Sequence, residues 1–151
     1  MTRNIFQSET TRELVNRINR LTPETKPLWG KMNAGQVLAH LCVMYEMVYE
    51  TNHKRPNAFM RFLISLVAKE TVVGDKPYPR NARTAPAFVI VDQRDFEKEK
   101  QRLIDYIVRT EKSGEGFFDR RESHSFGKLT LPEWNNYFYK HLNHHLTQFG
   151  V

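Results

Sequence analysis

Apolar side chains recur three or four residues apart in five stretches of the chain, and segments rich in glycine and proline separate these stretches. This spacing is typical of helices that bury one face. The pattern predicts helices from Thr10 to just before Pro23, over 33–49, over 58–69, from Asp92 or Asp95 to 112, and over 130–150. An irregular segment is expected at 72–87, then an extended lead-in at 88–91, and a second loop at 113–129.

Three of the expected helices begin with a polar residue followed three positions later by Glu or Gln, which is the spacing of a capping box. These pairs are Thr10-x-x-Glu13, Asn33-x-x-Gln36 and Thr130-x-x-Glu133. The last helix also has proline in its first turn, where no backbone N–H is needed, and glycine at its end. Its boundaries are therefore the most sharply marked in the chain.

The faces of these helices differ in character. The helix at 33–49 is apolar around most of its circumference, so we expect it at the centre of the core. The run 58–68 is also apolar, but it contains Arg61 and is shorter than the roughly 18 to 20 residues that cross a bilayer. It is predicted to be a buried or interfacial helix. The helix before 113 carries charges along one face and should border the core.

Four longer helices and one short one predict an all-α fold, a four-helix bundle with an additional short helix and long crossover loops. The 151 residues are enough for one domain, expected to span 1–151, with a core that needs no disulfides. The single cysteine, Cys42, cannot form an intrachain bridge. It should also point about 200° away from His40 on their common helix.

Composition narrows the classes of partner. The net charge is +6, but the basic residues are scattered among acidic ones rather than gathered in a stripe with stacking aromatic residues. We therefore expect no nucleic-acid partner and no membrane partner. The N-terminal residues lack an apolar signal segment, and one cysteine gives no reason for an oxidising compartment, so a cytoplasmic location is expected.

The last helix carries the most specific chemical signal. His141 and His145 are four residues apart, which places both imidazoles on one face of a helix, about one turn from each other. Trp134 and Phe138 lie on the same stripe, so this face should point inward. His144 lies roughly 80° from the centre of that stripe. A pair alone could also be surface decoration near the negative end of the helix dipole.

A third histidine makes the pair a candidate metal site. His40 lies in the middle of the most apolar helix, so it should point inward as well, either as a hydrogen-bonded core histidine or as a ligand. His40, His141 and His145 facing one another would supply three neutral nitrogens. Such a set suits Zn²⁺ first, and Ni²⁺ or another divalent transition metal next. Three protein ligands leave a coordination position open for water or substrate.

Three segments resemble a branch of the DinB/YfiT superfamily that has no assigned function. They are WGKMNAGQVLAHL at 29–41, HSFGKLTLPEW at 124–134 and HLNHHLTQFG at 141–150. The resemblance implies a four-helix bundle with a three-histidine metal site, whose ligands map to His40, His141 and His145. The common superfamily ending is His-His-Arg-Gly-Gln, whereas Leu146 and Thr147 precede Gln148 here. No contact between that arginine and an anionic substrate is therefore carried over.

The resemblance also implies an activity. Characterised relatives use a low-molecular-weight thiol, so the expected function is divalent-metal-dependent S-transfer or hydrolytic chemistry on a small-molecule substrate. The alternative is a non-catalytic bundle that binds a small ligand or a protein, with a structural or vestigial metal site. A homodimer is possible in either case.

Four polar residues are candidates for orienting a ligand or contacting substrate: Asn33, Gln36, His124 and Gln148. His124 precedes the last helix directly and could supply a proton, or it could be an ordinary loop residue. His53 lies beside Lys54 and Arg55 and is expected to be exposed to solvent.

Overall fold

The computed structural model describes residues 3–151. Its α-helices are α1 (Ser8–Asn19), α2 (Ala34–Tyr49), α3 (Ala58–Val73), α4 (Phe96–Phe118) and α5 (Leu131–Gln148). A 3₁₀ turn, η1 (Pro86–Phe88), precedes α4, and strands β1 (Glu122–Ser123) and β2 (Gly127–Lys128) form a small antiparallel hairpin between α4 and α5. The described chain is mostly helical, as the sequence predicts.

Most helix starts agree with the predicted caps. Asn33 and Gln36 form a reciprocal capping box at α2, and Thr130 and Glu133 form another at α5. At α4 the cap is Asp95, whose side chain accepts from the N–H of Lys98, so the alternative Asp92 is wrong. The capping box predicted at Thr10 is also wrong. The helix begins at Ser8, and Thr10 lies buried within its first turn instead of preceding it.

Two boundaries between helix and loop, and the structure of one loop, differ from prediction. Helix α3 continues to Val73 and has 16 residues, so it is not short, and the irregular segment starts only at Gly74. Gly114 leaves the helical conformation with a φ of 69° and forms a kink, and a second helical piece follows it to Phe118. The hairpin lies in the segment predicted as loop, whereas residues 88–91, predicted as an extended lead-in, form no strand, as expected.

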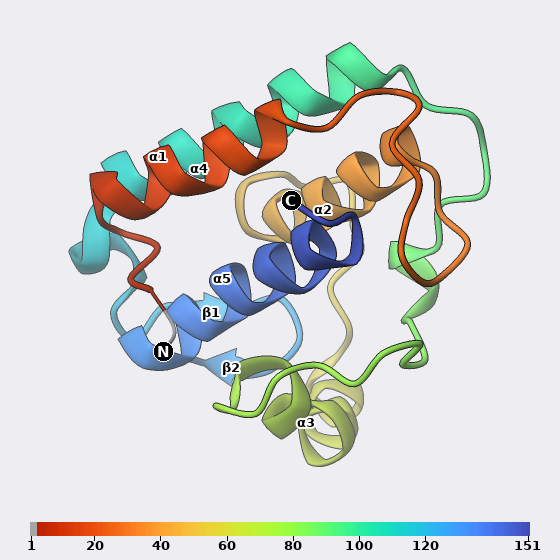
Figure 1. The fold of residues 1–151 in the computed structure, drawn as a ribbon. Helices are drawn as coiled ribbons and strands as arrows, with labels where there is room; N and C mark the ends of the chain where they lie inside the picture. Colours follow the sequence, from red (N-terminus) through yellow and green to blue (C-terminus); the bar gives the residue numbers. More distant parts are fainter. Residues whose placement is uncertain (1–2) are drawn as a thin grey trace.

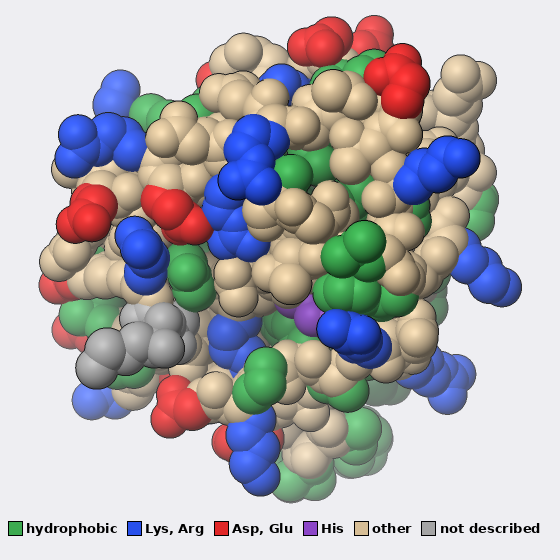
Figure 2. Space-filling view, viewed as in Figure 1, with side chains coloured by type: hydrophobic (Ala, Val, Ile, Leu, Met, Phe, Trp, Pro, Cys, Tyr) green, Lys and Arg blue, Asp and Glu red, His purple; other side chains and the backbone are tan. Residues whose placement is uncertain are grey.

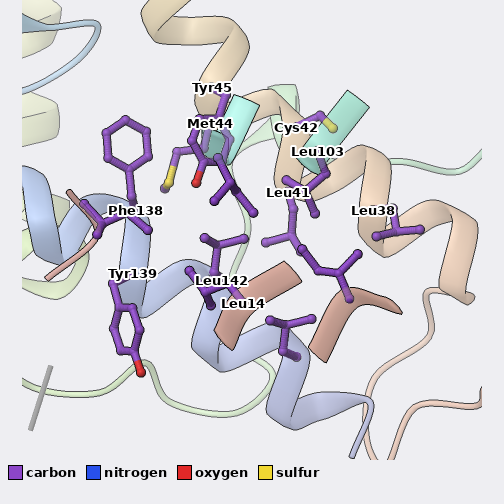
Figure 3. Packing of buried hydrophobic residues seen from close by; sticks show 14 of the residues in the cluster. Leu14, Leu38, Leu41, Cys42, Met44, Tyr45, Leu103, Phe138, Tyr139 and Leu142 are labelled. Carbon is purple, nitrogen blue, oxygen red and sulfur yellow. The ribbon is translucent and has the colours of Figure 1, made fainter. Parts of the chain in front are cut away.

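The helices lie in three rows (Figure 1). Helices α1 and α4 run side by side along one edge, α2 and α5 occupy the middle, and α3 lies beyond α5 on the opposite side from α1. Leucines and aromatic residues from α1, α2, α4 and α5 fill the space between the first two rows, as Figure 3 shows for Leu14, Leu41, Leu103 and Phe138. Helix α2 is buried along most of its length, which confirms its predicted central position.

Helix α3 packs differently from the others. Only Val73 of its 16 residues is buried, while Leu66 is 69 % and Val67 is 85 % exposed. The alternative that the apolar run at 58–68 is buried is therefore wrong, and the alternative that it is an interfacial helix stays a prediction. Within residues 3–151, no helix combines the length and apolar character that crossing a membrane requires.

Candidate metal centre

The three predicted histidines meet between the two middle helices. His40 projects from α2, and His141 and His145 project from α5, one turn apart. One ring nitrogen from each of them lies within 4.8 Å of the others. His40 is 4 % and His141 is 7 % exposed, whereas His145 is half-buried. The inward stripe of α5 is confirmed, since Trp134, Phe138 and Gln148 are buried on the same side.

A backbone carbonyl fixes the orientation of His40. Its Nδ1 lies 2.8 Å from the carbonyl oxygen of Phe88 in η1. A carbonyl oxygen only accepts, so Nδ1 carries the hydrogen and donates it. In the neutral ring the lone pair is then on Nε2, which lies 2.9 Å from Nε2 of His141. The α3–α4 connection thus determines which nitrogen of His40 is available as a ligand.

The side chain of Gln148 fixes His145 in a similar way, through a carbonyl in the α1–α2 connection. The amide Nε2 of Gln148 donates to the carbonyl oxygen of Trp29 at 2.7 Å, which determines which way the amide points. Its Oε1 therefore faces Nδ1 of His145, at 2.7 Å. Nδ1 must donate this bond, so Nε2 of His145 keeps its lone pair for a ligand.

Gly30 makes room for this arrangement. Its φ is +85°, a backbone conformation that residues with a side chain rarely adopt. A Cβ at this position would also collide with the amide nitrogen of Gln148. The hydrogen bond from the N–H of Leu28 to the carbonyl oxygen of Gln148, at 2.7 Å, holds the same connection against the end of α5. The segment before α2 is therefore part of the support of His145.

Burial keeps the three imidazoles neutral. Desolvation lowers the pKa of His40 and lowers that of His141 well below 6.5, while the neighbouring histidines lower the His141 pKa further. Desolvation, followed by repulsion from His40, lowers the pKa of His145 to about 3. Neutral imidazole is the form that binds metal ions.

The chemistry of the donor set, and the spacing of one of its nitrogen pairs, suit a transition-metal ion. Two nitrogens at 2.0 to 2.1 Å from one ion stand about 2.9 to 3.3 Å apart when the angle between them is roughly 90° to 110°. The 2.9 Å between Nε2 of His40 and Nε2 of His141 falls in this range. Nitrogen ligands alone suit Zn²⁺, Ni²⁺ and similar ions better than Mg²⁺ or Ca²⁺, which prefer oxygen.

Aromatic rings surround the cluster on the side away from the core. The ring of Phe88 lies 5.5 Å from that of His40 and 5.8 Å from that of His141. Tyr78 packs edge-on against His141 and His144, and Trp29 packs against His144. In Figure 2, histidine atoms reach the surface beside hydrophobic side chains and a cationic one. The cluster is therefore shielded by rings but reachable from solvent.

The other candidates have partners away from the cluster. Gln36 is the capping partner of Asn33 and also donates to the carbonyl oxygen of Asp92, at 3.2 Å. His124 hydrogen-bonds Ser125 in the hairpin and the carbonyl oxygen of His53. Cys42 points to the carbonyl oxygen of Glu99, as its position on the helix predicts, and burial raises the pKa of its thiol to about 12.

His53 is not free in solvent. Its side chain is 21 % exposed, and its Nε2 lies 2.6 Å from Oε2 of the buried Glu46. The expectation of an exposed His53 is therefore wrong, because a carboxylate seven residues earlier turns toward it. Sequence reasoning also missed Trp29, Tyr78, Phe88 and the role of His144 near the cluster. Trp29, Tyr78 and Phe88 lie in connections with no period that links them to a helix face, whereas the sequence pattern places His144 on a face of the last helix next to the inward stripe.

Comparison with known proteins adds a family. The family described as "Protein of unknown function (DUF1569)" has a model that matches residues 2–150, almost the whole chain. The chain belongs to this family. No curated protein and no solved structure matches it. For this DUF1569 chain, the evidence on function therefore lies in the geometry of the site.

The metal-free protein should lose stability as the pH falls below about 6.5. Folding keeps His40, His141 and His145 neutral, whereas the unfolded chain takes up protons near its ordinary histidine pKa. The free energy of unfolding should then fall by up to about 1.4 kcal/mol per pH unit for each such histidine. Urea unfolding in the presence of a chelator, between pH 7.5 and 5, measures this slope. His141→Leu should reduce it, and an unchanged slope would contradict the assignment.

Replacing Gln148 should weaken metal binding without removing a ligand. Gln148→Leu deletes the acceptor that orients His145, and loss of such a contact costs roughly tenfold to a hundredfold in affinity. Gly30→Ala should act in the same direction, because its Cβ displaces the same amide. Competition with a chromophoric chelator measures the affinity. Gln101→Leu, on the exposed face of α4, is the matched control, and an equal effect in both glutamine variants would contradict this role.

Proposed function

We propose that this protein is a divalent-metal-dependent enzyme of the DinB-like type, in which His40, His141 and His145 hold the ion. One observation carries the proposal. Two helices whose histidines lie 101 residues apart in sequence bring three neutral ring nitrogens within 4.8 Å of one another. The hydrogen bonds to Phe88 and Gln148 leave Nε2 as the available nitrogen on both His40 and His145. Surface histidines have no need of such support.

The arrangement of helices supports the DinB-like part of the proposal. Helices α1, α2, α4 and α5 share one core, and α3 belongs to the long connection between α2 and α4. We interpret these four as the expected bundle with a crossover. The ligands then come from its second and last helices and point into it, as in other bundles whose metal sites lie between facing helices.

Zinc is the proposed ion, with nickel as the next choice, because all three ligands are imidazoles. When bound, the ion lowers the pKa of a thiol or water at its open position. The ring of His144 lies 4.9 Å from that of His145, and burial, followed by the charge of Arg80, lowers the pKa of His144. This histidine is neutral at pH 7 and is placed to accept the proton that the thiol or water loses.

A small-molecule thiol is the proposed co-substrate. After losing its proton, its sulfur would form a bond to an electrophilic carbon, and the leaving group would depart with the bonding electron pair. The rings of Phe88 and Tyr78 restrict water around the cluster, which favours the thiol over hydrolysis. This is a proposal for S-transfer in preference to hydrolytic chemistry.

Protein purified without an affinity tag should contain close to one equivalent of a transition metal. Elemental analysis by mass spectrometry measures it. His141→Ala should lower the content at least tenfold, because only two of the three proposed ligands remain. His144→Ala is the control and should keep the metal. Equal metal content in the His141 variant and the wild type would contradict the three-histidine site.

Metal-loaded protein should show thiol-dependent turnover of a simple electrophile. Glutathione, bacillithiol and mycothiol are the thiols to compare, with consumption of the electrophile followed by absorbance. Treatment with a chelator should abolish the activity, and added Zn²⁺ should restore it. If metal is present but no thiol gives turnover or raises the melting temperature, the non-catalytic alternative is favoured.

A further inference from the structure

A guanidinium group lies at the solvent side of the three-histidine cluster. Arg80 comes from the α3–α4 connection, and its Cζ lies 4.2 Å from the centroid of the Trp29 ring. The Trp29 ring packs edge-on against His144 at 5.9 Å, and the His144 ring lies 4.9 Å from that of His145. Trp29, Tyr78, Arg80 and His144 thus form a rim around the cluster. Contacts through Trp29 and His144 therefore connect the positively charged Arg80 to the candidate ligand His145.

The neighbours of Arg80 hold it in place. The carbonyl oxygen of Trp29 accepts from the buried Gln148, so the ring under the guanidinium is tied to α5. Two residues before Arg80, the Tyr78 hydroxyl donates to the carbonyl oxygen of Val72 at 3.2 Å, and its ring packs against His141 and His144. A guanidinium stacked on an aromatic ring is restricted in one plane but keeps its edge N–H groups free to donate.

The charge around the cluster is of one sign. Arg80 takes no part in the ion pairs formed by the described residues. Among charged side chains other than histidine, Arg80 is the one that shifts the pKa of a histidine in this group, and it acts on His144. A bound divalent ion would add positive charge. A neutral or cationic molecule gains nothing from this field, whereas an anion is attracted and oriented.

We propose that the rim is a subsite for a carboxylate on the small molecule that enters the cluster, with Arg80 as its main contact. Arginine presents two parallel N–H groups that match the two oxygens of a carboxylate. His144 lies between Arg80 and the cluster and can donate a further hydrogen bond. The inference rests on the proposed function, which places the reacting atom at the cluster, and it names the substrate class as a carboxylate-bearing thiol.

The alternative role for the stacking of Arg80 on Trp29 is purely structural, namely to hold the α1–α2 and α3–α4 connections together. Arg80→Met separates these roles, because methionine keeps an apolar contact with the indole ring but loses the charge and the N–H donors. Arg83→Met is the matched control. It removes the same charge from an exposed position three residues away in the same connection. Both variants should melt within a few degrees of the wild type.

The first experiment uses protein loaded with Co²⁺, in which thiolate binding is followed by its absorption band. The two thiols compared are 3-mercaptopropionate, which carries a carboxylate, and 2-mercaptoethanol, which carries a hydroxyl group in its place. A hydrogen bond to a charged group is worth about 1.5 kcal/mol or more, so we expect at least a tenfold preference for the carboxylate. Arg80→Met should reduce it to about twofold or less. The control should retain it.

The second experiment tests the subsite without any metal. Metal-free protein is titrated with glutarate or glutaramide, and the NMR signals of Arg80 and His144 are followed. Saturable shifts with glutarate that disappear in Arg80→Met support the subsite, even if the protein proves to bind no metal and the proposed function fails. Equal affinity for both thiols, together with no glutarate shifts, overturns the subsite while leaving the metal centre intact. Equal losses in the Arg80 and Arg83 variants overturn it as well.

Discussion

The contact between Nε2 of His40 and Nε2 of His141, at 2.9 Å, is the constraint around which the rest of the site is organised. Two buried lone pairs facing each other repel unless a proton or a cation lies between them. Burial also limits the access of water to the Nδ1 atoms of His40 and His145, so these atoms need partners within the protein. The carbonyl oxygen of Phe88 meets this need for His40, and Gln148 meets it for His145.

This requirement explains why the two long connections are held tightly to the helices. The segment before α2 must present the carbonyl oxygen of Trp29 to Gln148, and the segment before α4 must present that of Phe88 to His40. Lys140 helps to anchor the second of these, since its amine donates to the carbonyl oxygens of Thr71 and Gly74 at the end of α3. The same two connections deliver Trp29, Tyr78 and Arg80 to the rim. The two connections that orient the histidines therefore also form most of the rim.

A second polar group lies between α2 and α4. The carboxylates of Glu46 and Glu99 are nearly buried, and each is paired with Arg102, while His53 and Arg94 provide further contacts. Every carboxylate here has a cationic partner, which is the condition under which buried charge is tolerated. These pairs join the two helices that contact each other most extensively. None of these carboxylates belongs to the three-histidine cluster, whose candidate ligand atoms are all nitrogens.

The sequence by itself determined most of the helices and the three histidines of the cluster. A period near 3.6 and three-residue capping spacings are local properties, so the starts of α2 and α5 and the inward stripe of His141 and His145 were predictable. It did not determine the start of α1 or the end of α3, where the helix includes residues outside the stretch that carries a clear apolar period. Only the tertiary structure decided which carbonyls orient His40 and His145, and that Arg80 lies over Trp29. Such contacts join residues 48 to 119 positions apart, and no pattern along the chain records them, because they depend on how the connections cross the helices.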